Sequence, residues 1–154
     1  MAVKLKTPIS EVDRLIFQTN QYAERKTVRV LGFLGEKCII EARDRSQQES
    51  WYDQTGNLRS SIGYVIMVNG KIVSTNGFGK VKNGSNGVLE GKALARKLAG
   101  NYKTGYALIV VAGMHYAAYV EAMDNKVVLT SAELLARREL PGMMRQLKTQ
   151  IATR

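Results

Sequence analysis

Side chains that could act as nucleophiles or metal ligands are few in this chain of 154 residues. His115 is the only histidine, and a zinc site needs three or four nitrogen or sulfur ligands, so a histidine cluster is excluded. Cys38 is the only cysteine and lies on the apolar stripe of a predicted helix, where it is typical of a small buried hydrophobic residue. A Cys38–His115 pair in a small hydrolase or transferase is an open alternative, although no local signature supports it.

The carboxylates and glycines also lack the pattern of an active site. None of the acidic residues near predicted loops has the paired spacing of a general acid and base: Asp53, Glu90, Glu121, Asp124 and Glu133. The glycines at 77 and 79 are not followed by the rest of a dinucleotide fingerprint, and the chain has no Gly-Lys-Ser/Thr sequence of a phosphate-binding loop. We therefore expect no enzymatic activity, no cofactor and no metal.

The chain is strongly basic, with a formal net charge of +10 and a pI near 9.9. A small basic nucleic-acid-binding protein is therefore the second functional hypothesis. The lysines and arginines are spread over the whole chain, however, and no aromatic residues alternate with them as a base-stacking surface requires. No apolar run approaches the ~18 residues of a membrane span, and no signal-peptide core is present, so we expect synthesis in the cytoplasm and no membrane contact.

The elements that must position these residues begin with a long helix. Apolar residues recur every three or four positions from about residue 8 to about residue 45, which predicts an amphipathic helix that begins at Thr7-Pro8. Gly32 and Gly35 each cost about 1 kcal/mol relative to alanine inside a helix, so we expect a kink or break there. Because the remaining residues are too few to cover such a helix, we expect part of it to pack on a neighbouring subunit.

A hairpin follows the long helix. From Leu58 onward apolar and polar residues alternate, which is the period of a half-buried strand. Asn69-Gly70 between two apolar runs is a strong signal for a tight turn. Together these features predict a hairpin over residues 58–73.

The rest of the chain is predicted to combine helices with short strands. Its expected elements are a Gly/Asn-rich loop at 74–87, a helix at 88–99, strands at 106–112 and 127–129, and a helix that Thr130 caps and Pro141 breaks. The form of residues 116–121 stays open. We expect one domain over residues 1–154, with a helical segment at 8–45 and a body at 55–154. Its predicted class is α+β, with helices on one face of a small, mostly antiparallel sheet.

Two stretches together resemble the paired motifs of a bacteriophage family. The first runs from Asp53 to Tyr64 (Asp-Gln-Thr-Gly-Asn-Leu-Arg-Ser-Ser-Ile-Gly-Tyr) and the second from Tyr116 to Glu121 (Tyr-Ala-Ala-Tyr-Val-Glu). In this order they resemble the tail-completion, or neck, proteins of long-tailed double-stranded-DNA phages, a family similar to the minor tail protein Z of lambdoid phages. The resemblance covers about residues 9–135, and it departs from the family where Ala122 to Asn125 replace a Gly-Thr turn. The motif positions are Thr55, Gly56, Leu58, Arg59, Ser60, Tyr116, Tyr119, Val120 and Glu121.

This resemblance implies a structural virion protein at the head–tail junction. A member of the family would form a homo-oligomeric ring, a hexamer or dodecamer, that joins the tail to the DNA-filled head and surrounds the path of the DNA. Its partners would be further copies of itself, the head-completion or connector protein, and the tail-terminator or tail-tube protein. Non-specific contact with passing DNA would also fit the basic charge.

Arg59 is the motif residue to which we assign a polar role. On the predicted strand its side chain points away from Leu58 and Ile62, so it could hold a carboxylate through paired hydrogen bonds, with Glu121 as one candidate partner. We therefore expect Arg59→Ala to weaken folding or ring assembly more than Lys82→Ala does.

Overall fold

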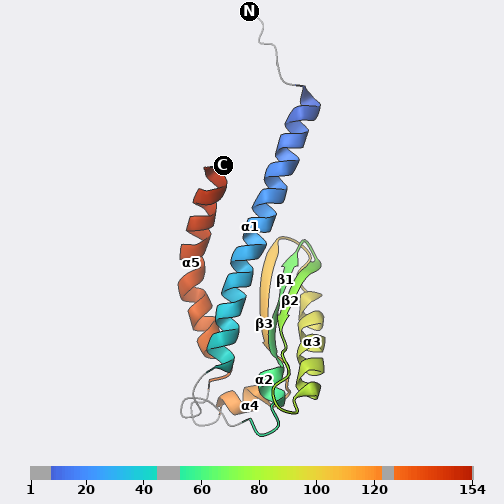
Figure 1. Ribbon diagram of the computed structural model, residues 1–154, viewed down its shortest axis with the longest axis vertical. Helices are drawn as coiled ribbons and strands as arrows, with labels where there is room; N and C mark the ends of the chain where they lie inside the picture. The colour runs from blue at the N-terminus through green and yellow to red at the C-terminus, as the bar shows by residue number, and fades with distance from the viewer. Residues whose placement is uncertain (1–7, 45–52, 123–126, 154) are drawn as a thin grey trace, which may run out of the picture.

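The computed structural model describes residues 8–44, 53–122 and 127–153 of the chain (Figure 1). The fold is α+β, as the sequence predicts, with a long N-terminal helix, a three-stranded antiparallel sheet and further helices. The elements in chain order are α1 (Ile9–Arg43), α2 (Asn57–Ser60), β1 (Ile62–Val68), β2 (Lys71–Gly77), α3 (Ser85–Ala99), β3 (Tyr106–Ala112), α4 (Ala117–Ala122) and α5 (Thr130–Ala152).

The sheet has the strand order β2-β1-β3, and β1 runs antiparallel to both neighbours. β1 and β2 form the predicted hairpin, and the turn residues Asn69 and Gly70 have φ angles of 48° and 81°. Positive φ at both central positions favours Asn-Gly, which is why this dipeptide marks the turn. The hairpin spans Ile62–Gly77 and not residues 58–73, because residues 57–60 form the short helix α2.

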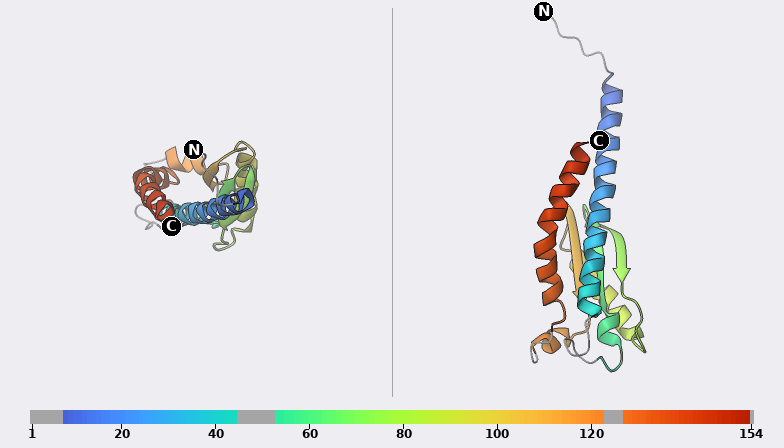
Figure 2. Two further views of the ribbon diagram at one scale, coloured as in Figure 1. Left: turned by 90° about the horizontal axis from the view of Figure 1, so that it is seen from above. Right: turned by 60° about the vertical axis from the view of Figure 1, so that its left-hand side comes forward.

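Helices cover both faces of the sheet, which corrects the expectation that they pack on one face. α1 packs on the face that carries Ile62, Tyr64 and Ile66, and α3 packs on the face that carries Val65 and Met67. Because successive side chains of a strand point to opposite faces, β1 is buried along its whole length. The layers are therefore α3, the sheet, α1 and α5 (Figure 2).

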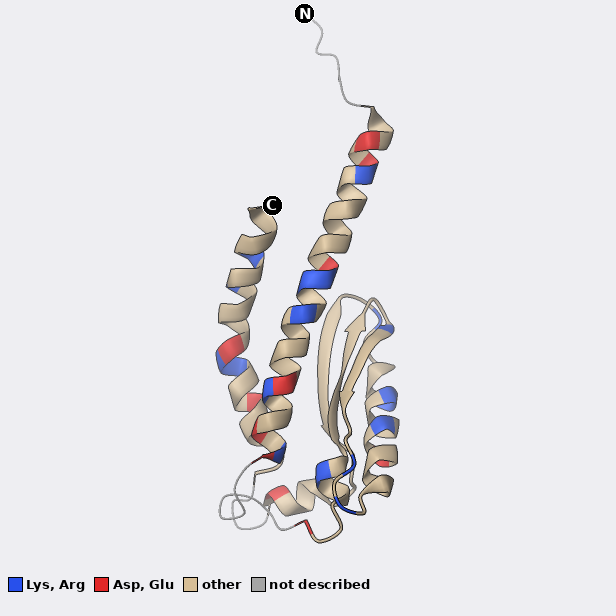
Figure 3. Ribbon diagram, viewed as in Figure 1, with Lys and Arg blue, Asp and Glu red and all other residues tan. Residues whose placement is uncertain are grey.

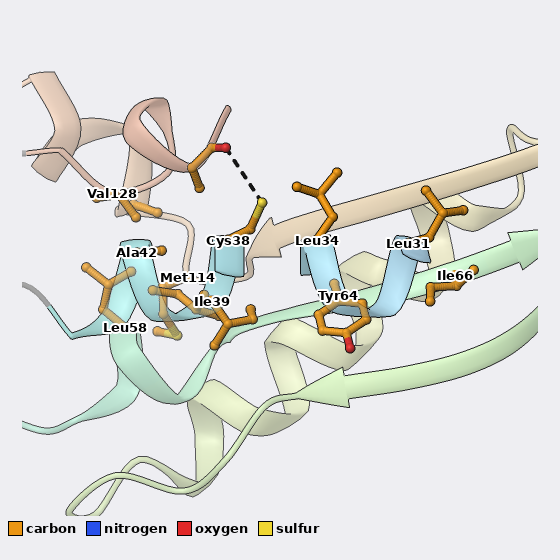
Figure 4. Packing of buried hydrophobic residues seen from close by; sticks show 13 residues of the cluster. Leu31, Leu34, Cys38, Ile39, Ala42, Leu58, Tyr64, Ile66, Met114 and Val128 are labelled. Atoms are coloured by element: carbon orange, nitrogen blue, oxygen red, sulfur yellow. Dashed lines mark hydrogen bonds between the residues drawn. The ribbon is translucent and has the colours of Figure 1, made fainter. Parts of the chain in front are cut away.

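α1 is one continuous helix, so the predicted kink or break at Gly32 and Gly35 is wrong. Gly35 is buried, and a Cβ atom built on it would lie 2.8 Å from three ring atoms of Tyr64. Figure 4 shows the ring of Tyr64 against α1, near Leu34. The Tyr64 hydroxyl lies 2.8 Å from Oε1 of Glu36 and 3.2 Å from the carbonyl oxygen of Gly32. Burial and the Glu36 hydrogen bond raise the pKa of Tyr64 to about 12, although Asn76 acts in the opposite direction. Gly35 thus permits close packing of the helix on the sheet.

α5 is also continuous, so the predicted break at Pro141 is wrong. The helix runs antiparallel beside α1 (Figure 1). Lys37 of α1 forms an ion pair of 2.5 Å with Glu139 of α5. Packing along this seam, with Leu140 and Met143 against the core, holds the helix together across the proline. Proline removes one helical hydrogen bond, a cost that such packing can exceed.

Two further expectations are corrected. Residues 127–129 form no strand and lead directly into α5. The expected loop at 74–87 is short, because β2 continues to Gly77 and α3 begins at Ser85. The residues whose form the sequence left open, 116–121, largely belong to α4.

The N-terminal half of α1 projects beyond the sheet, and its first turns also project beyond the end of α5 (Figures 1 and 2). The first buried residue of the helix is Thr27, so Ile9 to Lys26 contribute nothing to the described core. At ~1.5 Å per residue this part extends for roughly 27 Å. Within the described residues, none of the helices combines the length and apolar character that a membrane span requires.

Candidate functional site

The first motif forms a hydrogen-bonded corner at the base of the molecule. The carboxylate of Asp53 accepts hydrogen bonds from the backbone N–H of Gly56 at 2.9 Å and of Arg59 at 2.8 Å, which caps α2. Gly56 has a φ of +80°, which favours glycine, and a Cβ there would lie 2.0 Å from the carbonyl oxygen of Val81. Leu58 inserts into the core and is 1% exposed. The corner is therefore a capped helical turn and not the start of a strand.

Ser60 and Ser61 connect this corner to two distant segments. The hydroxyl of Ser60 accepts a hydrogen bond of 2.8 Å from the N–H of Val81, in the connection between β2 and α3. The hydroxyl of Ser61 accepts hydrogen bonds from the N–H groups of Gly113 at 3.0 Å and Met114 at 3.3 Å, just after β3. Both serines are fully buried, so these bonds replace the water that the backbone groups would otherwise need.

The second motif lies beside the first. Tyr116 lies beside Thr55 and Asp53. Burial raises the pKa of Tyr116 and the charge of Asp53 raises it further, whereas the side chain of Thr55 acts in the opposite direction. Val120 packs against the core, whereas Tyr119 is 67% exposed. The two motifs are thus adjacent in space although about 60 residues separate them in the sequence. Thr55 and Tyr119 are the motif residues that the structure leaves exposed.

Glu121 caps α5 from the neighbouring helix α4. Its Oε1 accepts hydrogen bonds from the N–H groups of Val128, Leu129 and Thr130 at 3.3, 3.0 and 2.7 Å, and from the Thr130 hydroxyl at 2.6 Å. The first N–H groups of a helix have no partner inside the helix, and a carboxylate also complements the helix dipole there. The predicted capping box at Thr130 and Glu133 is therefore replaced by a carboxylate from a different element.

Arg59 and Glu121 have different partners, which corrects their expected pairing. Arg59 lies on α2 and not on a strand, and its Nη1 donates a hydrogen bond to the carbonyl oxygen of Arg43, near the end of α1. The side chain therefore connects α1 to the corner. Lys82 has a similar role, since its Nζ donates a hydrogen bond of 2.8 Å to the carbonyl oxygen of Asp53.

Two glycines that pack tightly against the first motif, Gly84 and Gly87, were not predicted from the sequence to have this role. A Cβ on Gly84 would lie 2.1 Å from Oγ of Ser60, and one on Gly87 would lie 1.9 Å from the carbonyl oxygen of Asn57. Gly84 directly precedes α3 and Gly87 lies in its first turn, but the surrounding glycines and asparagines have the composition of a flexible loop. The three-residue spacing of these glycines is the one signal that could have indicated a tightly packed helix start.

Cys38 and His115 occupy different environments. The thiol of Cys38 is buried and donates a hydrogen bond of 3.6 Å to the carbonyl oxygen of Ala132 (Figure 4). Burial raises the pKa of Cys38, and the charges of Glu139 and Glu41 raise it further. His115 is exposed and packs edge-on against Tyr116, with ring centroids 5.2 Å apart. A buried thiol with a raised pKa is a poor nucleophile.

A hollow of about 370 Å³ lies between β3, α1 and α5, beside Cys38. Its lining is mostly apolar and includes Leu108 and Val110, with the carboxylates of Glu121 and Glu133 among its polar groups. The carboxylate of Glu121 already accepts the hydrogen bonds that cap α5. Within the described residues, no group of three or more histidine, cysteine or acidic side chains is placed to hold a metal ion. Asp124, a carboxylate considered from the sequence, lies outside the described residues.

A second groove of about 370 Å³ follows the seam between α1 and α5. Its walls combine apolar and cationic side chains from both helices: Lys26, Arg29 and Phe33 of α1, and Met143, Gln146 and Gln150 of α5. Phe33 is 58% exposed in this groove. The groove begins at Lys26, directly beside Thr27, the first buried residue of α1.

Basic side chains are distributed over several elements and do not gather in one place (Figure 3). On α3, for example, Arg96 and Lys97 lie on the exposed side, on the opposite face of the sheet from α1. Comparison of the chain with protein-family models, with curated proteins and with solved structures found no match.

Proposed function

We propose that the chain is a structural subunit of the head–tail junction of a long-tailed double-stranded-DNA phage. In this proposal it is a tail-completion protein, forms a ring of identical subunits around the path of the DNA, and resides in the virion. The ring would join the filled head to the tail through contacts with the connector and with the tail-terminator or tail-tube protein.

The observation that supports this proposal is a division of roles between the motifs and α1. The motif residues mostly point inward and hold the base together: Asp53 caps α2, Ser61 holds the turn after β3, and Glu121 caps α5. The apolar stripe of α1, in contrast, continues far beyond the body that covers its lower part. Ile9 is 71% exposed and Ile16 is 54% exposed. Exposed apolar surface of this kind is typical of subunits that bury it against another chain in an assembly.

Deleting the gene in the phage genome that encodes the chain tests this function. We expect DNA-filled heads and separate tails in electron micrographs of the lysate, with joining restored by the chain supplied from a plasmid. Intact, infectious virions after the deletion would contradict the proposal. Neighbouring genes for a portal, a capsid protein and a tail-tube protein would support it independently.

Nucleic-acid binding remains the second candidate, and its support is the net charge of +10. A gel shift with duplex DNA at rising salt separates the two functions. Affinity of micromolar or better at physiological ionic strength, with a steep salt dependence, would favour the nucleic-acid-binding protein. Weak binding that disappears at that ionic strength is what we expect of a ring subunit.

A further inference from the structure

The same stripe of α1 has two different environments along the helix. Below Thr27 its apolar side chains, such as Leu31 and Leu34, are buried against the sheet and α5. Above Thr27 the stripe continues at the same spacing through Ile9, Val12 and Ile16, and there Ile9 and Ile16 are more than half exposed, whereas Val12 is partly buried. A helix with an apolar face is stable in water when another surface covers that face.

The exposed part of the stripe cannot reach the groove between α1 and α5 of its own chain. The helix is continuous from Ile9 to Arg43, and the groove between α1 and α5 includes Lys26 to Phe33 of the same helix. The projecting segment would have to fold back on itself, which would break the helix. The groove of another copy can receive it without any change in either fold.

The charges of the two surfaces are complementary. The projecting tip carries Glu11 and Asp13 against one cation, Arg14, which is 3.8 Å from Glu11. The groove has Lys26 and Arg29 in its wall, and the part of α5 beyond Leu140 carries only cations among its charged residues, Arg145 and Lys148. Figure 3 shows the acidic tip of α1 and the cations that follow it along the helix. Two tips or two grooves would repel each other, whereas a tip and a groove attract.

We propose that residues 9–20 of α1 dock in the groove between α1 and α5 of a second copy of this chain. The tip would add its apolar stripe to Phe33 and Met143 of the neighbour, and its carboxylates would lie near Lys26 and Arg29. Residues 9–20 extend for ~18 Å as a helix, and the groove from Lys26 to Phe33 is ~11 Å long, so about two turns of the tip fit along it.

This contact joins two different patches of the chain and is therefore heterologous. A heterologous contact whose rotation closes makes a ring, so the inference rests on the proposed ring and names the surfaces that build it. Each subunit would offer one tip and one groove, and every tip in a closed ring would be covered.

Engineered disulfides test the contact directly. We expect Ile16→Cys protein mixed with Gln146→Cys protein to give a cross-linked dimer under mild oxidation, and the double variant to give a ladder of higher oligomers. Gln18→Cys, which lies on the other side of the same helix, is the matched control for position 16, and Lys97→Cys on α3 is the control for position 146. Equal cross-linking by the controls, or no cross-link at Ile16 and Gln146, would overturn the inference.

Charge reversal gives a second measurement that does not need a cysteine. We expect Glu11→Lys with Asp13→Lys to weaken self-association by about tenfold or more in sedimentation equilibrium, and Lys26→Glu with Arg29→Glu in the mixed partner to restore it. The thermal unfolding midpoint should stay the same, because the tip lies outside the core. Unchanged self-association in the tip variant would overturn the contact.

The failure of this inference can be told apart from failure of the proposed function. Rings that form without cross-links between tip and groove, together with a junction that still needs the chain, would reject the docking and keep the function. A chain that remains monomeric at every concentration would reject the docking. If the deletion also leaves virions intact, the function is rejected as well.

Discussion

The ring of Tyr64 lies directly on the backbone of Gly35, where α1 meets the central strand. A Cβ atom at position 35 would stand 2.8 Å from three atoms of that ring, whereas one at Gly32 would meet the nearest atom, Cδ1 of Ile66, at 3.7 Å. Two glycines of one helix, one turn apart, therefore have different structural roles. Gly35 closely contacts an aromatic ring, whereas Gly32 has room for a methyl group.

Gly35→Ala should destabilise the protein by about 1–3 kcal/mol, because the buried ring must move and overpacking of a core costs that much. The loss should occur even though alanine is about 1 kcal/mol better than glycine inside a helix. Gly32→Ala is the matched control and should be neutral or slightly stabilising. Urea unfolding followed by circular dichroism measures both, and equal stability of the two variants would show that the Tyr64 ring accommodates the added methyl group.

Glu121→Gln should destabilise the protein by about 1–2 kcal/mol at neutral pH, the usual cost of losing a helix cap. Burial disfavours the charged form of Glu121, but the hydrogen bonds from Thr130, Leu129 and Val128 outweigh it and lower the pKa below its ordinary value of 4.5. Because the pKa is lower in the folded than in the unfolded chain, this stability is present above about pH 4.5 and is lost as the pH falls through the folded pKa.

Unfolding free energies measured between pH 3 and pH 7 should therefore differ less between wild type and Glu121→Gln as the pH falls. The control is Glu133→Gln, since that side chain is 61% exposed and pairs with Arg137 on the helix surface. Such surface pairs contribute about 0.5 kcal/mol or less. A constant difference between wild type and Glu121→Gln over the whole range would show that the carboxylate charge does not stabilise α5.

Arg59→Ala should destabilise the folded chain by about 1–2 kcal/mol, because it leaves the carbonyl of Arg43 without the charged donor that now reaches it. Lys82 is not a neutral comparison, since it donates to the carbonyl of Asp53. Lys80 is exposed and lies in the same connection, so Lys80→Ala is the suitable control. Equal shifts of the thermal unfolding midpoint in Arg59→Ala and Lys80→Ala would show that Arg59 does not stabilise the corner.

Pro141→Ala should stabilise the monomer, by up to about 3 kcal/mol, because it restores a hydrogen bond inside a helix that continues through this position. The gain will be smaller if the packing of α5 on α1 requires the local geometry that proline imposes. Differential scanning calorimetry gives the change. A loss of stability would indicate that the proline shapes the seam with α1.

Cys38 should react slowly with a thiol reagent in the folded protein and completely after unfolding in urea. The thiol is buried, and its raised pKa keeps it protonated at neutral pH. The absorbance of a released aromatic thiolate follows the reaction. Rapid modification of the folded chain at pH 7 would revive the alternative of a nucleophilic cysteine.

Local patterns were sufficient to predict the long helix and the hairpin turn. The stripe of α1 follows from its 3.6-residue period, and Asn69-Gly70 determines the turn because both positions adopt positive φ. The predicted class, α+β, follows from the order of these elements. The strand prediction is confirmed from Ile62 onward, but residues 58–60 misled because their alternation matches a strand, whereas Asp53 caps a short helix there from several residues upstream.

The remaining errors depend on contacts between residues far apart in the chain. Gly35 appeared to weaken a helix, but its role is set by Tyr64 on the sheet. Thr130 appeared to cap its own helix, but the cap comes from Glu121 on α4. Period and composition do not reveal which distant side chain will supply such a partner.

The pairing of α1 with α5 brings together elements from opposite ends of the described chain, as the Lys37–Glu139 ion pair illustrates. During synthesis, α1 leaves the ribosome before α5, so the lower stripe of α1 is only partly covered until α5 has been made. Contacts of high sequence separation slow folding, and surface exposed meanwhile favours aggregation. The interval in which α1 is most prone to aggregate is therefore the one before α5 is made.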